Sequence, residues 1–521
     1  MPSFQATQKN ITLWMVFGIF ILAGSVLLPW YRFQVNFDGI SYLSIAQKYM
    51  IGDFKNAING FWSPLYVWLL LPFYWLNFDH LIASKVLNLA IGAVSFIGIK
   101  QLADRFSISS DVRLAVLITL IPHILLYSLC LIGPDVLTAC ILIFYCNTLL
   151  APDYAQRSRY GILCGILGGL AYLSKSFCLP FFIVHYPLIN LFLYLSAGSS
   201  VNKKGVMINF LWGTVLFMII SAPWIFLISA KYDHFTFSEK GTANILLLNV
   251  EQPKSLPKFV PPPDQYAVSV WDDPSHFFST YYDAWNPLGS IGNIKISAKN
   301  FIFNCYKLLG ICFDASILFV IFLVGTLVCL FWKPRFLLSQ KKILSVLLLM
   351  LIYVAGYCMV YVELRYFIIV SILVVIICGY ALNALFLKYS LFSRLKYGLL
   401  LLLIISFWVQ PIQQLKKTVN VGKDVFTLAN SLKNVVKPQS RIVNNADYIK
   451  GVFLAYHLNC SIYGASENMS IDELGAQLDK YKIDYFITLN ASDNLISSVS
   501  SYELAGSSSY QDKKVLVYSR R

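Results

Sequence analysis

The chain has 521 residues, of which 57% are hydrophobic and 13% are charged, and its formal net charge is +15 at pH 7. Soluble domains carry about 25% charged residues, so this composition excludes an ordinary soluble globular protein. The positive charge does not indicate nucleic-acid binding, because the basic residues lie mostly in short loops between apolar runs.

The apolar runs predict about eleven membrane-spanning helices, since a helix of about 20 mostly apolar residues crosses roughly 30 Å of hydrocarbon. They lie near residues 11–30, 80–101, 113–131, 136–151, 160–174, 178–196, 206–230, 304–332, 343–361, 366–387 and 397–413. Phe61–Leu76 is also apolar, but it is short, contains two prolines and is rich in aromatic residues. We therefore expect an interfacial or re-entrant segment there.

The charges of the loops predict the orientation of these helices. Basic residues collect near 100–113, 157–159, 203–204, 333–342 and 388–396. Placing all five segments in the cytoplasm satisfies the positive-inside rule. Loops 31–79 and 231–303, together with everything after residue 413, then lie on the non-cytoplasmic side. We thus predict a membrane domain over 1–413 and a soluble domain over 414–521.

The soluble C-terminal part predicts a small α/β domain. Strands are expected at 441–444, 461–463, 483–489 and 514–518, and helices at 446–458 and after Ser470. Ser470 and Glu473 have the spacing of a capping box. The domain has no glycine-rich phosphate loop and no nucleophile elbow, so we expect it to support or recruit an acceptor and not to carry chemistry itself.

Cysteine and histidine patterns argue against a disulfide framework and a zinc site. Nearly all of the eleven cysteines lie inside apolar runs, with Cys460 the clear exception, and no CxxC pair is present. The six histidines form no ligand pair at helical spacing.

An acidic residue directly follows the first predicted span. From Gly39 to Met50 the apolar positions predict an amphipathic helix that lies on the membrane, with Asp38 as its N-cap. A charge at the membrane boundary often marks a function. The simpler interpretation of Asp38 is a plain helix cap.

Five short motifs follow one another in an order typical of one family. They are Asp38-x-x-x-Tyr42-x-x-x-Ala46, Phe61-Trp62-Ser63-Pro64-Leu65-Tyr66, Gly133-Pro134-Asp135, the glycine-rich run that ends at Lys175, and Glu363-Leu364-Arg365-Tyr366. In this order they resemble the GT-C glycosyltransferases, above all the protein O-mannosyltransferases and the bacterial lipid A aminoarabinose transferase. The resemblance covers roughly residues 11–390.

The resemblance implies a membrane enzyme that moves a sugar from a polyprenyl-phosphate donor to a protein, lipid or glycan acceptor. The reaction would take place on the periplasmic face of a bacterial inner membrane, among membrane lipids. A carboxylate would take the proton of the attacking hydroxyl, and cations would stabilise the lipid phosphate that leaves. The implied catalytic residues are Asp38, as the general base, and Asp135, and the implied substrate-binding residues are Tyr42, Lys175, Glu363 and Arg365.

Three positions depart from the aminoarabinose transferases. Gly39 and Ser41 stand where those enzymes have glutamate and arginine, and Ser63 stands where they have a lysine before proline. Cations that hold the lipid phosphate there are therefore missing at two places, which indicates a different donor or acceptor. A monophosphate donor does not demand a metal. A diphosphate donor often does, and Asp38 and Asp135 could then be ligands of a divalent cation.

Other interpretations stay open at this stage. Lys175 could be an interfacial anchor, and Glu363 and Arg365 could form a structural ion pair. The rival function is that of a transporter or a lipid or polysaccharide flippase, which would show paired broken helices and charges near the membrane midplane. A polymerase that resembles the O-antigen polymerases would also use a large outer loop, but it would not place its main acid directly after the first span.

Overall fold

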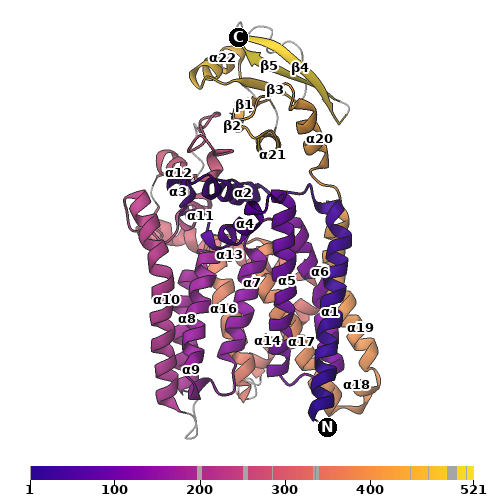
Figure 1. Cartoon of the computed structure of the whole chain (residues 1–521). Helices are drawn as coiled ribbons and strands as arrows, with labels where there is room; N and C mark the ends of the chain where they lie inside the picture. Colours follow the sequence, from indigo (N-terminus) through magenta and orange to yellow (C-terminus); the bar gives the residue numbers. More distant parts are fainter. Residues whose placement is uncertain are drawn as a thin grey trace.

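A bundle of long helices is capped at one end by short helices and by a small α/β domain (Figure 1). The computed structural model describes residues 2–195, 202–249, 256–283, 285–332, 335, 339–445, 447–466, 469–489, 501–511 and 513–521. The N-terminus lies at the far end of the bundle and the C-terminus lies in the small domain, so the two termini are on opposite sides (Figure 1).

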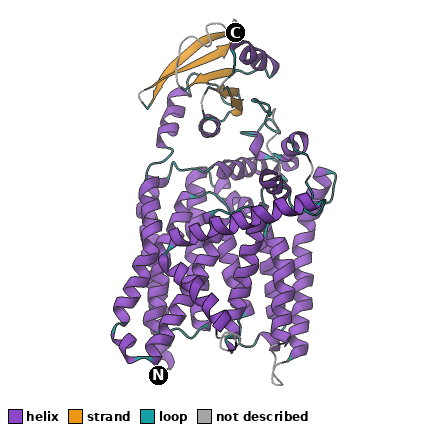
Figure 2. Cartoon of the chain, turned by 180° about the vertical axis from the view of Figure 1, so that it is seen from behind, coloured by secondary structure: helices purple, strands orange, loops and turns teal. Residues whose placement is uncertain are grey.

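The predicted class of a polytopic helical membrane protein with a C-terminal α/β domain is confirmed. Eight segments of the described chain are long and apolar enough to cross a membrane. They contain α1 (Pro2–Tyr31), α5 (His80–Arg105), α6 (Ser110–Cys130), α9 (Cys178–Leu195), α10 (Lys203–Tyr232), α16 (Lys341–Val360), α17 (Ile368–Lys388) and α19 (Lys396–Thr418). Three shorter helices, α7 (Asp135–Leu149), α8 (Arg159–Ser174) and α14 (Ile317–Trp332), run beside them and correspond to the other predicted spans (Figures 1 and 2).

One predicted span is wrong in its bounds. Residues 304–332 do not form one helix, because the backbone is extended at Ser316 and separates α13 (Ile291–Ala315) from α14. Lysines recur along α13 at positions 295, 299 and 307, which makes this helix amphipathic. It does not meet the length and hydropathy expected of a span, and it lies at the end of the bundle near the small domain (Figure 1).

Predicted outer loop 31–79 forms three helices at the same end of the bundle: α2 (Phe37–Met50), α3 (Phe54–Ala57) and α4 (Pro64–Trp75). Helix α4 has 12 residues, which gives it a length of about 18 Å. That length is too short to cross the hydrocarbon, as expected for the segment Phe61–Leu76. Predicted loop 231–303 contains α11 (Glu239–Asn249), the short η2 (Val270–Asp272), α12 (Ser275–Tyr281) and the start of α13.

The basic loops meet at the other end of the bundle. The Lys342 ammonium donates to the backbone oxygen of Arg105 at 2.6 Å. Lys396 forms an ion pair with Asp111. These contacts gather three of the five basic segments on one side, as the charge pattern predicts. The small domain lies at the opposite end of the bundle (Figure 1).

Glycines in α8 allow two helices of the bundle to approach closely. A Cβ atom at Gly161 would lie 2.3 Å from the backbone oxygen of Asn209, and one at Gly165 would lie 2.3 Å from that of Gly213. Both partners belong to α10. The glycine repeat is thus a packing surface of the small-xxx-small kind.

The C-terminal domain is a five-stranded mixed sheet with strand order β2-β1-β3-β5-β4. Strand β1 (Arg441–Asn444) pairs in parallel with β2 (Ser461–Ala465) and β3 (Tyr485–Thr488), whereas β5 (Lys513–Arg520) runs antiparallel to β3 and β4 (Tyr502–Tyr510). The helices are α20 (Lys423–Leu432), α21 (Tyr448–Leu458) and α22 (Ile471–Lys480). The predicted Ser470 cap is confirmed, since its hydroxyl accepts from the Glu473 amide. Ala446, the predicted start of the first helix, lies outside the described residues. Strand β4 was not predicted, because Ser507 to Ser509 lack the apolar alternation of a strand.

The outer loop 256–283 joins the small domain to the membrane domain. At the sheet edge, the Val260 amide donates to the Tyr463 oxygen at 2.7 Å, and the Ile462 amide donates to the Val268 oxygen at 2.8 Å. Tyr463 and Ile462 belong to β2. The loop therefore covers the edge of β2, which would otherwise present unpaired backbone groups.

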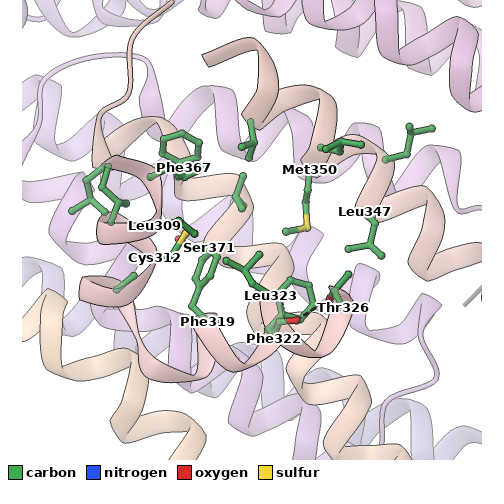
Figure 3. Close-up of a pocket in the computed structure, with 18 of the residues that line it drawn as sticks. Leu309, Cys312, Phe319, Phe322, Leu323, Thr326, Leu347, Met350, Phe367 and Ser371 are labelled. Carbon is green, nitrogen blue, oxygen red and sulfur yellow. Dashed lines mark hydrogen bonds between the residues drawn. The ribbon is translucent and has the colours of Figure 1, made fainter. Parts of the chain in front are cut away.

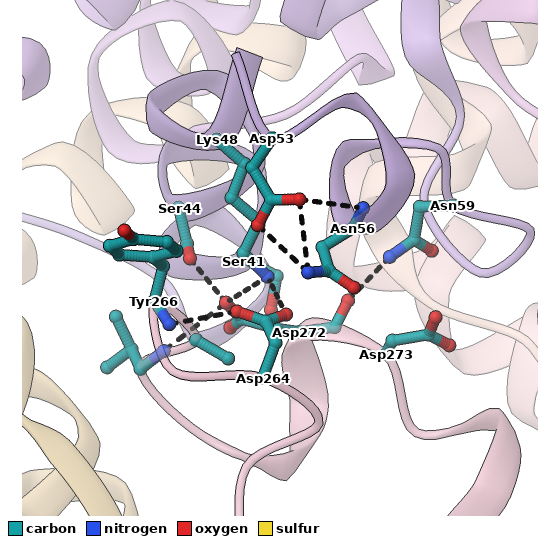
Figure 4. Close-up of polar contacts among 12 residues, drawn as sticks. Ser41, Ser44, Lys48, Asp53, Asn56, Asn59, Asp264, Tyr266, Asp272 and Asp273 are labelled. Atoms are coloured by element: carbon teal, nitrogen blue, oxygen red, sulfur yellow. Dashed lines mark hydrogen bonds and ion pairs between the residues drawn. The ribbon is translucent and has the colours of Figure 1, made fainter. Parts of the chain in front are cut away.

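The same loop is bound to α2 by a buried ion cluster (Figure 4). The Lys48 ammonium contacts Asp264 at 2.7 Å and Asp272 at 3.5 Å. Both Lys48 and Asp272 are almost completely buried. Ser44 donates a hydrogen bond to the Asp272 carboxylate, and Asn59 donates to the Asp272 backbone oxygen at 2.7 Å. Burial raises the pKa of the Asp272 carboxyl to about 6, although Lys48 opposes that shift.

Removal of the central cation should detach this loop. In Lys48→Met, two carboxylates lose their buried partner, and we expect a loss of about 3–5 kcal/mol in the free energy of unfolding. Thermal unfolding in detergent would measure the loss, and limited proteolysis would test whether loop 256–283 becomes accessible. Lys55→Met is the matched control, because Lys55 is exposed on α3. An unchanged melting temperature and an uncleaved loop in Lys48→Met would contradict this role.

Candidate active site

The chain between α1 and α2 is held from three sides. The buried Lys85 ammonium donates to the backbone oxygens of Gln34 at 2.9 Å and Leu129 at 2.7 Å, which ties the end of α1 to the end of α6. The Asn36 side chain accepts from the Ile132 amide at 2.7 Å. These contacts fix where α2 begins.

Asp38 is not the N-cap of this helix, contrary to the prediction. The N-cap is Asn36, and Asp38 is the second residue of α2. Its carboxylate is therefore free of the capping role and points to residues outside the helix. The interpretation of Asp38 as a plain cap is wrong.

Helix α2 also differs from the predicted surface helix. Nine of its residues are buried, among them the polar Ser41, Ser44 and Lys48. The amphipathic pattern predicted one face in the membrane and one in water. The outer loop 256–283 and α21 cover the second face, which explains why its polar residues are buried and paired.

Asp38 makes the central ion pair of the site. Its Oδ2 atom accepts from the Arg365 guanidinium at 2.7 Å and lies 3.7 Å from the Lys240 ammonium. Arg365 also pairs with Glu363. Burial alone would raise the pKa of the Asp38 carboxyl, but Lys240 and Arg365 outweigh burial and hold that pKa below its ordinary value. Asp38 is thus ionised at neutral pH.

A second pair lies beside the first. The Lys175 ammonium donates to Asp135 Oδ1 at 2.6 Å and stands 3.8 Å from the centre of the Tyr366 ring. Asp135 begins α7, and Lys175 follows the last residue of α8. Burial lowers the pKa of the Lys175 ammonium, although Asp135 opposes that shift.

Tyr42 lies one helical turn after Asp38 and is buried between the two pairs. Its ring meets Trp62 and Tyr66 edge to face, at centroid distances of 5.2 Å and 5.6 Å. Burial raises the pKa of its phenol, and the charges of Asp135 and Asp38 add to that shift. The structure therefore brings all six residues proposed from the sequence to one place.

Sequence reasoning did not find Lys240. This residue lies in α11, and its ammonium is 3.9 Å from the centre of the Trp62 ring. Trp62 precedes Ser63, the position at which the resemblance expects a lysine. Burial lowers the pKa of the Lys240 ammonium to about 8, which Asp38 opposes only in part. No motif surrounds Lys240 in the sequence, so only its position in space links it to the site.

Two cavities border the ion pairs. A cavity of about 590 Å³, called here the Asp38 cavity, is lined by Asn36, Asp38, Tyr127, Glu363, Arg365 and Thr418, among others. A second cavity of about 490 Å³, called here the lysine cavity, is lined by Lys175, His234, Ser238, Lys240, Tyr361 and Tyr366, among others. The cations and carboxylates of the site stand between the two.

A third cavity is almost purely apolar and has a volume of about 450 Å³ (Figure 3). It lies among α13, α14, α16 and α17, and Leu323, Met350 and Phe367 are among the side chains that surround it. Leu364 lines both this apolar cavity and the Asp38 cavity. The short helix η3 (Leu364–Phe367) is therefore where the cavities meet.

The two carboxylates considered as ligands of a divalent cation do not fit that role well. Asp38 and Asp135 each form an ion pair with a side-chain cation, so a divalent cation would have to compete with Arg365 for Asp38 and with Lys175 for Asp135. Within the described part of the chain, no three His, Cys, Asp or Glu side chains are grouped for metal binding.

Known structures share this architecture. ArnT from Cupriavidus metallidurans in the apo state matches with a TM-score of 0.55 at 14% identity, over 98% of each chain. The same protein bound to undecaprenyl phosphate matches with a TM-score of 0.55 at 14% identity, over 97% of each chain. The oligosaccharyltransferase AglB from Archaeoglobus fulgidus, in complex with an inhibitory peptide and a dolichol-phosphate, matches with a TM-score of 0.55 at 13% identity, over 92% of this chain and 69% of AglB. The chain has the GT-C fold.

The likeness lies in structure and not in sequence. No protein-family model matches the chain, and no curated protein matches its sequence. The GT-C fold confirms the resemblance that the five motifs indicated. At 13–14% identity such a likeness establishes a fold and not a substrate.

The packing around Gly39 explains one of the departures from the expected motif. A Cβ atom at Gly39 would lie 2.7 Å from Ile132 Cβ and 2.8 Å from Asn36 Oδ1. The turn after α6 thus packs directly against the first turn of α2. A glutamate does not fit at this position without a shift of the helix.

Gly39→Glu should therefore destabilise the protein. We expect a loss of about 1–3 kcal/mol in the free energy of unfolding, because the added side chain overpacks the contact with Ile132. Thermal unfolding in detergent would measure the effect. Gln47→Glu, an exposed change on the same helix, should leave the melting temperature unchanged. Equal melting temperatures of Gly39→Glu and the wild type would refute the packing argument.

Proposed function

We propose that the protein is a glycosyltransferase that moves a sugar from a polyprenyl-phosphate donor to an acceptor on the non-cytoplasmic side of the membrane. The observation that carries this proposal is the position of the Asp38 carboxylate. It lies at the end of the bundle that bears the small domain, and it is ionised. It lines the Asp38 cavity, which shares Leu364 with the apolar cavity, and its ion partner Lys240 lines the lysine cavity.

Asp38 is suited to act as the general base. Among the residues that the structure describes, its ion pairs and hydrogen bonds are all made through Oδ2. Oδ1 is then the atom that takes the proton of an acceptor hydroxyl. Geometry and charge state are the two requirements for this role.

The reaction forms one bond and breaks one. The acceptor oxygen attacks the anomeric carbon as its proton moves to Asp38, and the bond from that carbon to the phosphate oxygen breaks. The phosphate leaves with its bonding electrons, so negative charge develops on it. Attack from the side opposite the phosphate inverts the anomeric centre.

Cations near Asp38 stabilise the leaving phosphate. Lys175 and Arg365 are fixed by their carboxylate partners, and fixed charges stabilise a transition state without reorganisation. Asp135 holds Lys175, and Glu363 holds Arg365. Tyr42 is buried between the two pairs and packs against Trp62 and Tyr66.

The basic loops support the proposed side of the membrane. They lie at the end of the bundle opposite the small domain, and the positive-inside rule favours a cytoplasmic position for them. In a bacterial inner membrane the site and the small domain would then face the periplasm. The bound lipids of two neighbours, undecaprenyl phosphate for ArnT and dolichol-phosphate for AglB, support a polyprenyl-linked donor.

The general base can be tested by one substitution. Asp38→Asn keeps the size of the side chain but cannot take the proton, so we expect transfer to fall roughly 100- to 10,000-fold. The measurement is transfer of radiolabelled sugar from polyprenyl phosphate in membranes that contain the protein.

Asp283→Asn is the matched control, because Asp283 is an exposed aspartate of the other outer loop, 256–283. Its transfer rate should equal that of the wild type. Wild-type rates in an Asp38→Asn protein that is expressed and folded would remove Asp38 from the reaction.

A further inference from the structure

We propose that Lys240 binds the phosphate group of the polyprenyl-phosphate donor, and that the phosphate lies in the lysine cavity. This inference rests on the proposed function, because it names the place of the donor in that reaction. It assigns a role to a residue of the outer loop that no sequence motif marks.

Lys240 is the cation of the site whose hydrogen bonds are available. Arg365 and Lys175 each donate to a carboxylate, at 2.7 Å and 2.6 Å. Lys240 approaches Asp38 only to 3.7 Å, and it makes no hydrogen bond within the described part of the chain. An ammonium group has three N–H donors, and a phosphate oxygen can accept from it without breaking an existing pair.

The lining of the two polar cavities differs in charge. The lysine cavity has Lys175 and Lys240 and contains no carboxylate among its described lining residues. It also offers hydroxyl groups, for example those of Ser176 and Thr236. The Asp38 cavity has two carboxylates, Asp38 and Glu363, for one guanidinium. An anion is therefore favoured in the lysine cavity, and an uncharged acceptor hydroxyl is favoured beside Asp38.

The position of the apolar cavity fits an amphiphilic donor. Helix α16 lines the apolar cavity up to Val354 and lines the lysine cavity from Tyr357 onward. Three residues of helix separate these positions by about 4.5 Å. A lipid whose phosphate contacts Lys240 can thus place its chain along the same helix, among apolar side chains.

Helix α11 holds Lys240 in this position from both ends. The Glu239 amide donates to the Gly60 oxygen at 2.9 Å. At the other end, the Asn300 side chain of α13 donates to the Leu248 oxygen at 2.9 Å. The Lys240 ammonium also packs on the face of the Trp62 ring, in a cation–π contact.

The test compares two lipids on the purified protein in nanodiscs: undecaprenyl phosphate, and undecaprenol, which lacks the phosphate. We expect the wild type to bind the phosphate lipid more tightly. Lys240→Ala should weaken binding of undecaprenyl phosphate roughly ten-fold or more and leave binding of undecaprenol unchanged. Lys55→Ala, an exposed lysine of the same outer layer, should leave both affinities unchanged.

The possible failures are distinguishable. If Lys240→Ala binds undecaprenyl phosphate as well as the wild type does, Lys240 is not the phosphate ligand, and the proposed glycosyl transfer is unaffected. If the wild type itself does not prefer undecaprenyl phosphate over undecaprenol, the protein does not recognise a lipid phosphate. That result would contradict both the proposed function and the role of Lys240. An equal loss for both lipids in Lys240→Ala would assign a structural role to Lys240 and overturn the inference.

Lys240→Arg adds a readout that a structural role would not change. This variant should keep the phosphate binding at about pH 7 and retain it up to about pH 9.5, because a guanidinium stays protonated. Wild-type affinity should fall above about pH 8, as the Lys240 ammonium loses its proton. The charged groups that face Lys240 are Asp38, Asp135, Lys175 and Arg365, with Glu239 and His234 on its own segment. An equal fall in the wild type and in Lys240→Arg would assign the pH dependence to Lys175 and contradict the proposal.

Discussion

The contact between Asp38 and Arg365 is the interaction on which the rest of the site depends. It joins two residues 327 positions apart in the chain, one in the first outer helix and one in the turn between α16 and α17. Around it the charges balance, with Asp38, Asp135 and Glu363 opposite Lys175, Lys240 and Arg365. A buried charge without a partner costs several kcal/mol, so each member of this set holds the others in place. A charged ligand that entered the site would replace some of these ion pairs. Its own charge would decide whether it binds the cations or the carboxylates.

Helix η3 carries the residues that separate the apolar and the charged parts of the site. Leu364 lines both the apolar cavity and the Asp38 cavity, and Phe367 lines the apolar cavity. Between them, Arg365 donates to Asp38, and the ring of Tyr366 faces the Lys175 ammonium. Four consecutive residues thus contact the apolar cavity, the Asp38 carboxylate and the Lys175 ammonium. This arrangement is possible because a 3₁₀ turn distributes consecutive side chains around its axis, about three to a turn. In the proposed reaction, the donor and the acceptor would therefore approach the same point from different sides.

The sequence predicts those features that depend on local pattern. The spans follow from hydropathy, the orientation from basic loops, and the Ser470 cap from its spacing to Glu473. The six site residues follow from motifs, and the fold brings them together. The features that sequence reasoning missed depend on contacts between distant segments. Lys240 belongs to the site only because α11 lies against Trp62, and α2 is buried only because loop 256–283 covers its polar face. The break at Ser316 was missed because the mostly apolar segments on both sides of it, although interrupted by Lys307 and Asp314, together have the length and hydropathy of a span.

Loop 256–283 is bound at one end to strand β2 and at the other to Lys48 of α2. Loop 256–283 therefore connects the small domain to α2, the helix that carries Asp38, although the two are far apart in the chain. Exchange of the C-terminal domain alone between proteins of this fold would therefore disturb the membrane domain. A foreign domain would arrive without a matching strand edge for this loop, and the helix beneath would lose its cover. Domain and loop are thus expected to be inherited together.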